Sequence, residues 1–450
     1  MANQNGQLRK VMTEAGCSYE GLARRVNMIG ISYGLSLTYD KSSVSYWVKG
    51  KTPRGMVPLI VAEALSQKLD RVVTPAEIGF GDEWELDLVS SSLKQQSDLA
   101  ATLDVTEKLG KADMERREFL YLLPFSASAA LGPQRDWLLH LLRGKDEVGN
   151  AVRMEQVENM RLMMKVFIEA DNTYGGSHAR TALASYLHHD VVPLIRTQST
   201  DTVRRELFIA SAELCMTLGW MTYDIGAWGL AQRYLTQGLS LAGEAGSPGF
   251  AIGSNILSAL SHVATFTGNA AEAVNIAQVA VHSAVRSGSP ASLTRALAME
   301  ARAYATLGDR KTAAIMARTE AARAAQGDDP EWMSFLDEHY MTNQFAYCCR
   351  ETGQTQRMFE FAESSLAHST GRQIVSNTTY MAWARLDDGH LEEACRLGIR
   401  AADQAARLQS RQVGRLVLDL ADRIVGKGHE REPLAAEFLR HTTALKHRES

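Results

Sequence analysis

The sequence predicts an all-α protein, built from a small N-terminal helical domain and a long array of helix pairs. Three observations support this fold class. The chain of 450 residues contains only ten prolines, and 45% of all its residues are hydrophobic. This composition permits long helices. Apolar residues recur at helical spacing near the N-terminus. In the second half of the chain, glycines recur at intervals of roughly one helix pair.

Charge is divided unevenly along the chain. Residues 1–80 hold ten Lys and Arg against six Asp and Glu, a net charge of +4, whereas the remaining residues carry −8. A basic segment on an acidic body is expected when one end meets an anionic polymer, although a difference of this size also arises by chance. The five cysteines are scattered without a CxxC pair, so they favour a reducing cytoplasm over a disulfide framework. No apolar run is long enough to span a membrane.

Composition divides the chain into four segments. The N-terminal domain covers 1–80, and a polar connector rich in Asp, Ser and Gln covers 81–113. A helical middle region at 114–200 then leads into the repeat array at 201–450.

Three short helices begin the N-terminal domain. The first carries a single apolar stripe and ends at Gly16. The second starts after Ser18, a good N-cap, and keeps its arginines outside. The third begins after the N-cap Asp40 and stops at Gly50. Further helices are expected at 57–68 and 74–78.

The third helix has two sharply different faces. Val44, Trp47 and Val48 share one side by helical geometry. The opposite side carries hydroxyls, a phenol and an ammonium, groups that can reach base edges or phosphates from a major groove. These residues are Ser42, Ser45, Tyr46 and Lys49.

Two stretches of this domain, SYEGLARRV at 18–26 and KSSVSYWVKGKTPR at 41–54, resemble the helix-turn-helix of the phage-repressor and xenobiotic-response-element family. In that family a Leu-Ala pair marks the second helix, and the pattern S-x-V-x-x-W-x-x-G-x-x-P marks the recognition helix and its exit. The resemblance implies groove-facing positions at Ser42, Ser43, Ser45, Tyr46 and Lys49, and phosphate contacts from Arg25, Lys51 and Arg54.

The sequence departs from that family between the second and third helices. Ordinary members use a turn of 3–4 residues, whereas here twelve residues separate Asn27 from Asp40. Either the second helix runs on, or a loop or hairpin is inserted. A helical bundle whose serine-rich face contacts nothing is the alternative to DNA binding.

The middle region contains a pair of adjacent glycines flanked by polar residues. They follow a long helical pattern and could form a binding turn, although no phosphate-binding loop motif is present. The candidate ligand-binding residues are Asp171, Tyr174, His178 and Arg180. The alternative is a tight connection between packed helices, with Asp171 and Arg180 paired across it.

The array is marked by five glycines between helical stretches. They are Gly226, Gly268, Gly308, Gly353 and Gly389, at intervals of 42, 40, 45 and 36 residues. The residue five positions later is Ala231, Ala273, Ala313, Met358 or Ala394. A glycine that ends one helix and a small residue early in the next suit an antiparallel pair.

These units resemble tetratricopeptide repeats, with Ala301 and Tyr304 at matching positions. The resemblance implies an α-solenoid whose concave face receives peptides or proteins. A solenoid used for dimerisation alone is the alternative.

The whole arrangement resembles the peptide-sensing regulators of Gram-positive bacteria and, more closely, actinobacterial regulators of differentiation and antibiotic production. The segments GLARRVN, YDKSSVSYWVKGKTPRG, RREFL and YGGSHAR carry this resemblance, together with the domain order. It implies a cytoplasmic transcription regulator from a sporulating, Streptomyces-like bacterium. Our leading hypothesis adds that this regulator forms a homodimer through its helical array. Its partners would be double-stranded DNA and a peptide, ligand or protein, and it would not associate with a membrane.

Two other classes of protein compete with this interpretation. The first is an adaptor whose helix-turn-helix no longer binds DNA. The second is an enzyme, for which the G-x-S-x-G match at 30–34 lies in a helical domain and not at the strand-to-helix turn that a nucleophile requires. His188 and His189 with Asp190 resemble metal ligands only superficially, because neighbouring helical residues point about 100° apart and no third ligand lies at useful spacing. We therefore expect no catalytic residues, no metal and no cofactor.

Overall fold

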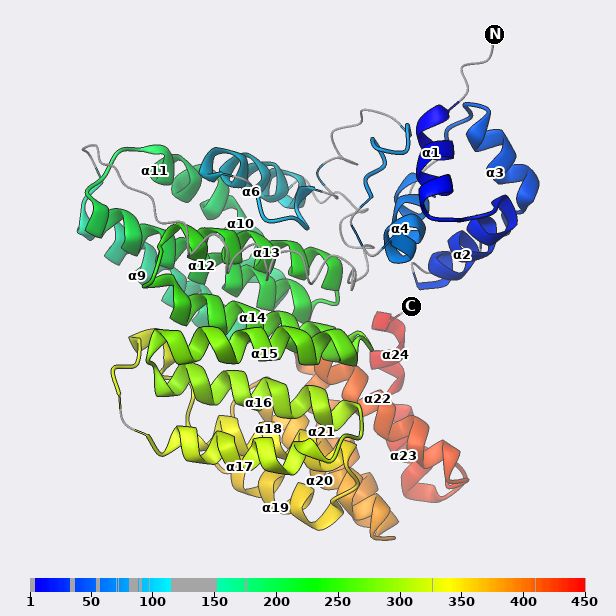
Figure 1. The fold of residues 1–450 in the computed structure, drawn as a ribbon. Helices are drawn as coiled ribbons and strands as arrows, with labels where there is room; N and C mark the ends of the chain where they lie inside the picture. The colour runs from blue at the N-terminus through cyan, green and yellow to red at the C-terminus, as the bar shows by residue number, and fades with distance from the viewer. Residues whose placement is uncertain are drawn as a thin grey trace.

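The computed structural model describes residues 5–32, 37–53, 57–69, 71, 73–80, 88, 91–96, 98–114, 152–174, 176–325, 327–408 and 410–449. Over these residues all regular secondary structure is helical, apart from a single isolated β-bridge between Val152 and Ser199. Figure 1 shows a small N-terminal group of helices and a large body of packed helix pairs. None of the described helices is long and apolar enough to cross a membrane.

The N-terminal group contains α1 (Gly6–Glu14), α2 (Tyr19–Ser32), α3 (Lys41–Val48) and α4 (Val57–Leu69). Its core is built from the predicted apolar stripes, with Leu22, Val26 and Val44 fully buried. The prediction of a helix at 74–78 is wrong, because residues 75–79 form a turn. That turn closes when the backbone N–H of Phe80 donates to the Pro75 carbonyl over 2.9 Å.

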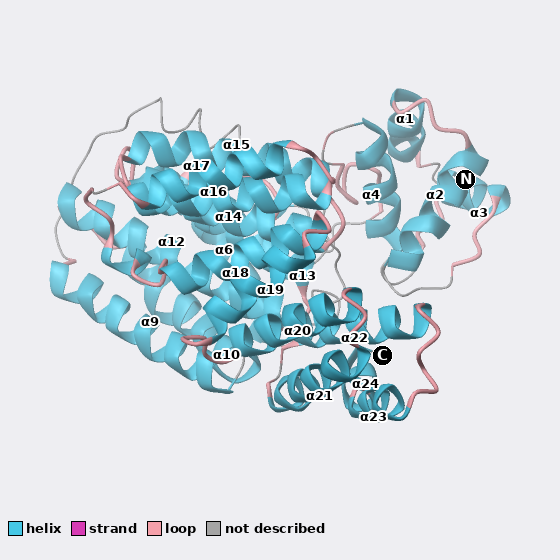
Figure 2. Ribbon diagram, turned by 90° about the horizontal axis from the view of Figure 1, so that it is seen from below, coloured by secondary structure: helices cyan, strands magenta, loops and turns pink. Residues whose placement is uncertain are grey.

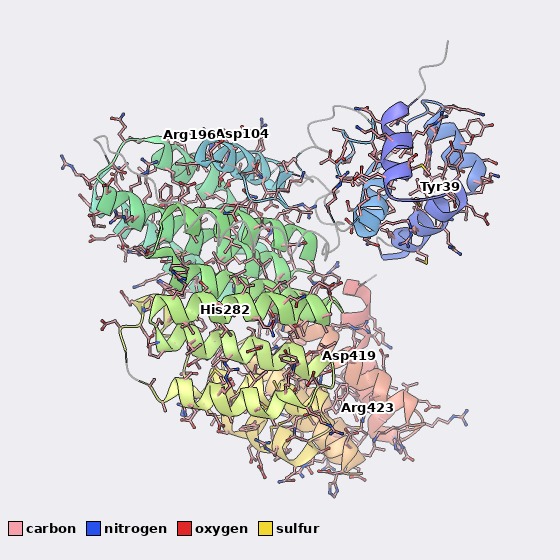
Figure 3. The ribbon with its side chains drawn as sticks, in the orientation of Figure 1. Tyr39, Asp104, Arg196, His282, Asp419 and Arg423 are labelled. Carbon is pink, nitrogen blue, oxygen red and sulfur yellow. The ribbon has the colours of Figure 1, made fainter. Side chains whose placement is uncertain are left out.

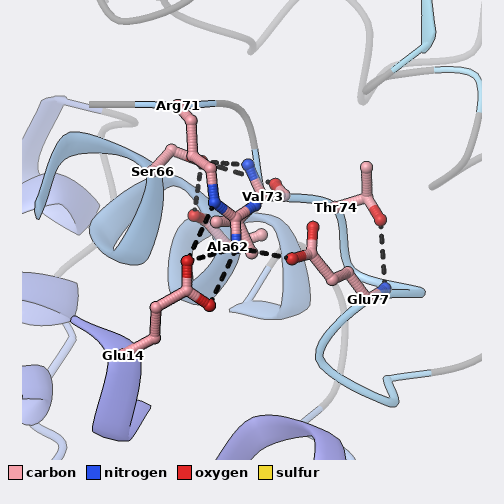
Figure 4. Close-up of polar contacts among 7 residues, drawn as sticks. All are labelled: Glu14, Ala62, Ser66, Arg71, Val73, Thr74 and Glu77. Carbon is pink, nitrogen blue, oxygen red and sulfur yellow. Dashed lines mark hydrogen bonds and ion pairs between the residues drawn. The ribbon is translucent and has the colours of Figure 1, made fainter. Parts of the chain in front are cut away.

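A polar clamp ties the chain after α4 back to α1. Arg71 lies between two carboxylates, with Nη2 at 3.0 Å from Glu14 Oε1 and 2.8 Å from Glu77 Oε1 (Figure 4). The buried Ser66 hydroxyl donates to the Ala62 carbonyl and accepts the Val73 N–H, both over 2.8 Å. Because the Arg71 pairs are partly exposed, each adds little to stability. Together these bonds fix the end of the N-terminal group.

The middle of the chain packs into the body. Its elements are α6 (Leu99–Met114), α9 (Met154–Tyr174), α10 (Gly176–Tyr186), the π-helical turn η1 (Leu187–Val191) and α11 (Val192–Arg196). Composition places most of helix α6 in the polar connector at 81–113. In the structure this helix packs against α10 and α13 and belongs to the body. Arg196 of α11 pairs with Glu107 of α6 at 2.6 Å, and Figure 3 shows Arg196 beside Asp104 at this end of the body.

The array consists of antiparallel helix pairs. Each pair packs internally, and the first helix of each pair also contacts the first helix of the next. The pairs are α12 (Asp201–Asp224) with α13 (Trp228–Glu244), α14 (Gly249–Phe266) with α15 (Ala270–Ser287), α16 (Pro290–Thr306) with α17 (Lys311–Arg323), α18 (Glu338–Glu351) with α19 (Thr355–Leu366), α20 (Arg372–Asp387) with α21 (Leu391–Arg407), and α22 (Arg411–Gly426) with α23 (Pro433–His441). A 3₁₀ turn, η2 (Glu331–Met333), precedes α18, and α24 (Thr443–Glu449) ends the chain.

All five glycines predicted to separate the helices follow the first helix of a pair and have positive φ, between 66° and 85°. At Gly268 the cap is a Schellman motif, because the next N–H, from Asn269, returns to the Ala264 carbonyl over 2.8 Å. The predicted helix-pair organisation is therefore confirmed.

The predicted small contact positions are buried in four of the five pairs, at Ala231, Ala273, Met358 and Ala394. The prediction is wrong for Ala313, which is exposed. Helix α17 begins three residues after Gly308, whereas the other second helices begin two residues after their glycines. One residue rotates a helix by about 100°. The buried residue beside this position is Thr312.

The array curls until its last part meets its first, since α22 contacts α12. The Ser410 hydroxyl, at the start of α22, donates to Asp224 Oδ1 at the end of α12 over 2.5 Å. Arg372, the first residue of α20, bridges Asp171 Oδ2 of α9 at 2.7 Å and Asp224 Oδ2 at 3.0 Å. Figure 2 shows α20 to α24 grouped at one side of the body. The first helices of the pairs therefore surround an interior cavity.

Candidate DNA-binding helix and ligand cavity

Helix α3 is fixed at its N-terminus by a capping box. The Asp40 backbone N–H donates to the Ser43 hydroxyl oxygen over 3.4 Å. In return, the Ser43 backbone N–H and the Ser43 hydroxyl both donate to Asp40 Oδ1, over 2.8 Å and 2.9 Å. These two hydrogen bonds lower the pKa of the Asp40 carboxyl. The inner face buries Val44, Trp47 and Val48. The helix therefore starts and packs as the sequence predicts.

The second helix runs on through Ile29, as one of the two expected alternatives has it, while Tyr33 lies outside the described residues. Helix α2 continues past Asn27 to Ser32, and residues 33–36 lie outside the described part of the chain. The Asn27 side chain then holds both backbone groups of Tyr39, as donor to its carbonyl at 2.7 Å and acceptor from its N–H at 2.8 Å. The Tyr39 ring packs edge-on against Trp47, with centroids 4.9 Å apart. Figure 3 shows Tyr39 in this N-terminal group.

The outer face of α3 is exposed and cationic. Ser42, Tyr46 and Lys49 are exposed, with 55% of Tyr46 accessible to solvent. The ammonium groups of Lys49 and Lys51 lie 5.9 Å and 5.5 Å from the centre of the Tyr46 ring. Two cations around an exposed phenol can neutralise phosphates beside a groove while the ring reaches a base edge.

The other residues suggested for DNA contact have different environments. Ser45 and Arg25 are half-buried on α3 and α2. The Ser43 hydroxyl is engaged by Asp40, so it is less free for a base than those of its neighbours. Arg54 lies outside the described residues. The accessible set on α3 and its exit is thus Ser42, Tyr46, Lys49 and Lys51.

Two of the four candidate ligand residues of the middle region, Asp171 and Arg180, have described side chains. Asp171 pairs with Arg372, while Arg180 pairs with the buried Asp113, so the expected Asp171–Arg180 pair is wrong. Tyr174 ends α9 and His178 lies in the first turn of α10, and the side chains of both are outside the described part. Of the four, Asp171 lines the interior cavity.

The interior cavity has a volume of about 370 Å³. Its walls come from α9, η2 and the first helices of all six pairs. A second cavity of about 540 Å³ adjoins it, and Arg302, Tyr380 and Gln412 line both. The size is in the range of sites for small ligands.

One side of the first cavity carries acidic residues that are paired with arginines. Asp171 and Asp224 share Arg372. Glu213 is buried, with Oε1 at 3.6 Å from Arg161 Nη2. Burial raises the pKa of the Glu213 carboxyl to about 7, against the opposing effect of Arg161.

The other side combines two arginines with aromatic rings. Arg295 donates to the Tyr340 hydroxyl over 2.6 Å and lies 5.6 Å from the Trp220 ring centre. Arg302 donates to Gln344 Oε1 over 3.0 Å and stacks on Tyr347, 3.6 Å from the ring centre. Within the described part of the chain, neither guanidinium has a carboxylate at ion-pair distance.

A neutral histidine lies in the same wall. His262 is buried, and its Nε2 is 3.0 Å from the Tyr223 hydroxyl. Burial, reinforced by Arg302 and Arg295, holds the pKa of His262 well below its usual value. The imidazole is therefore uncharged at neutral pH, and the positive charge here belongs to the arginines.

The sequence contains a signal for this cavity that is separate from the glycine spacing. On four of the six first helices, two residues that line the cavity are seven positions apart, which places them on one face two turns apart. The pairs are Glu213 with Trp220, Asn255 with His262, Arg295 with Arg302, and Gln373 with Tyr380. Polar residues at this spacing on otherwise apolar helices mark a concave face.

Replacement of Glu213 by Gln is expected to change the pH dependence of stability. Because the folded pKa of Glu213 is raised, its contribution is present below the unfolded value of 4.5 and is lost as pH rises through about 7. The free energy of unfolding in urea should be measured for both proteins at pH 5 and at pH 8. Relative to wild type, the variant should be about 2–3 kcal/mol more stable at pH 8 than at pH 5. A difference between the two proteins that does not change with pH would contradict the buried, raised carboxyl.

Comparison with known proteins gives one family match and one similar structure. Residues 8–81 match the family model described as the SP15 N-terminal domain, a span from α1 to just beyond Phe80. No curated protein matches the chain. Among solved structures, the apo form of the quorum sensor NprR from B. thuringiensis is similar at 12% identity, over 70% of this chain and 98% of that chain, with a TM-score of 0.34.

Proposed function

We propose that this chain is a DNA-binding transcription regulator whose helical array dimerises and senses a peptide, a small molecule or a protein. The observation that carries the proposal is the outer face of α3, where the ammonium groups of Lys49 and Lys51 both lie near the ring of the exposed Tyr46. The opposite face is anchored in the core through Trp47. A rigid helix with such a face is suited to a major groove.

The resemblance described above supports a finer proposal. The protein would act in the cytoplasm of a sporulating, Streptomyces-like bacterium and regulate development or secondary metabolism. In a homodimer, the body would bring two N-terminal groups together, so the array would set the spacing of the half-sites. The interior cavity of about 370 Å³ would receive the signal.

An adaptor without DNA affinity is the second candidate function. It is favoured by the modest +4 charge of residues 1–80 beside a body of −8. The continuation of α2 past Asn27 also separates this unit from an ordinary helix-turn-helix. Neither of these two proposed functions is that of an enzyme, and we assign no catalytic residue.

The two functions are separated by a shift assay of the full chain with random duplex DNA. If Arg25, Lys49, Lys51 and Arg54 all contact phosphate, the logarithm of the binding constant should fall with log salt at a slope of about −4 per bound N-terminal group. An absent shift at about 50 mM salt, with a protein partner co-purifying in stoichiometric amounts, would favour the adaptor.

A further inference from the structure

We propose that the interior cavity binds a ligand that carries an oxyanion, a carboxylate or a phosphate. Arg302 is its main anchor, and Arg295 lies on the same face of α16, two turns away. This inference deepens the sensing role proposed above and rests on it for its biological meaning. It specifies the chemical class of the signal, which the helix-pair architecture does not.

The charges of the cavity wall leave these two arginines uncompensated. Arg372 is neutralised by Asp171 and Asp224, and Glu213 faces Arg161. Arg295 and Arg302, in contrast, have neutral partners, a phenol and an amide. Buried guanidinium groups are ordinarily paired with an anion, because an isolated buried charge is costly. A ligand oxyanion would supply the missing charge.

Both arginines line the first cavity. They are seven residues apart on α16, so they share a face and lie about 10 Å apart along the helix axis. Each guanidinium therefore offers its own edge to a ligand. Arg295 is 3% exposed and Arg302 is 6% exposed, and Nε of each is buried without a hydrogen-bond partner among the described residues. A guanidinium with an open Nε edge can hold a carboxylate or a phosphate through two parallel hydrogen bonds.

Arg302 also lies where the two cavities meet. It lines both, together with Tyr380 and Gln412. A ligand longer than the first cavity and anchored at Arg302 would extend into the second. This position explains why Arg302, rather than Arg295, is the expected anchor.

A second unsatisfied group faces the first cavity from α14. Asn255 is 1% exposed, and both its Nδ2 and its Oδ1 are buried with no hydrogen-bond partner in the described part of the chain. An amide in this state loses the free energy of its hydrogen bonds unless a ligand or water provides them. Together with the rings of Trp220 and Tyr340, it indicates a ligand with an apolar or aromatic body and polar groups besides its anion.

The fluorescent probe 8-anilinonaphthalene-1-sulfonate tests the proposal, since it joins an oxyanion to an aromatic body. The full-length protein, without DNA, should bind one probe per chain with saturable fluorescence. Phenylacetate or phenyl phosphate should displace it, whereas the neutral phenylacetamide should not. Displacement by phenylacetate alone identifies a carboxylate site, and displacement by phenyl phosphate alone identifies a phosphate site.

The substitution Arg302→Gln should weaken probe binding at least tenfold, while Arg302→Lys, which keeps the charge but loses the fork, should weaken it less. Arg396→Gln is the matched control, because Arg396 lies on the outer helix α21 with its side chain 69% exposed. Thermal unfolding of each variant identifies any that fails to fold. If Arg302→Gln does not fold, the wild-type displacement series and Arg302→Lys decide the question.

Three results would overturn the proposal: no saturable binding, equal displacement by phenylacetamide, or unchanged affinity in a folded Arg302→Gln protein. Failure of the DNA-binding proposal is a separate outcome, because it concerns α3 and is measured with DNA. If the protein has an Arg302-dependent anion site and no affinity for DNA, the proposal of the site holds and the proposal of a transcription regulator fails.

Discussion

Replacement of Asp113 by Ala is expected to destabilise the body by about 3–5 kcal/mol. Asp113 of α6 is fully buried, pairs with Arg180 of α10 and accepts the Tyr234 hydroxyl of α13 over 2.6 Å. Without the carboxylate, Arg180 loses the charge that it faces in the interior, and Tyr234 loses its acceptor. Both losses leave desolvated polar groups behind.

Urea unfolding of the full chain measures this effect, with Asp113→Asn as the matched control. Asparagine can still accept from Tyr234 but carries no charge, so its destabilisation should be smaller than that of alanine and larger than zero. An alanine variant within about 1 kcal/mol of wild type would show that the buried pair does not hold α6 to the body.

Simultaneous replacement of Tyr46 and Lys49 by Ala is expected to weaken binding to a selected promoter by about 3 kcal/mol, roughly a hundredfold. Tyr46 is the exposed ring of α3, and Lys49 supplies one of its two neighbouring ammonium groups. Loss of the lysine should also reduce the salt slope by about 1, because one phosphate contact disappears.

Titration of promoter DNA at fixed salt measures this loss. Lys108→Ala is the control, since Lys108 lies on α6 and is half-exposed. Both exchanged α3 residues are exposed, so the double variant should retain the unfolding midpoint of the wild type. Unchanged promoter affinity in this variant would show that the recognition helix is assigned wrongly.

The local features of the N-terminal group could be predicted from sequence because short-range chemistry determines them. Asp40 caps α3 through its own neighbour Ser43, and Trp47 shares a buried face with Val44 by helical spacing alone. The return of the chain after α2 could not be predicted. It depends on the contact of Asn27 with Tyr39, twelve residues later, which no periodic pattern encodes.

The array shows the same division between local and distant determinants. The glycines were predictable because each ends a helix with positive φ. The Asp171 pairing was not, because its partner Arg372 lies 201 residues away and meets it after the array has curled. Asp171 and Arg180 are close in sequence but belong to different helices, α9 and α10, and each is satisfied by a different part of the fold.

The cavity is predictable in part. The seven-residue spacing of Arg295 and Arg302 places them on one face of α16 and is visible in the sequence. That this face points inward depends on the curvature of the array, which arises from the packing of consecutive pairs. The absence of a carboxylate near these arginines among the described residues is a property of the assembled walls.

Genome-wide crosslinking and sequencing of the DNA bound by the full-length protein, with wild type and the Tyr46→Ala, Lys49→Ala variant in parallel, tests the central claim most directly. We predict enrichment at promoters for the wild type and its loss in the variant at equal protein level. No promoter enrichment for the wild type, or equal enrichment for both proteins, would contradict the claim that α3 reads DNA.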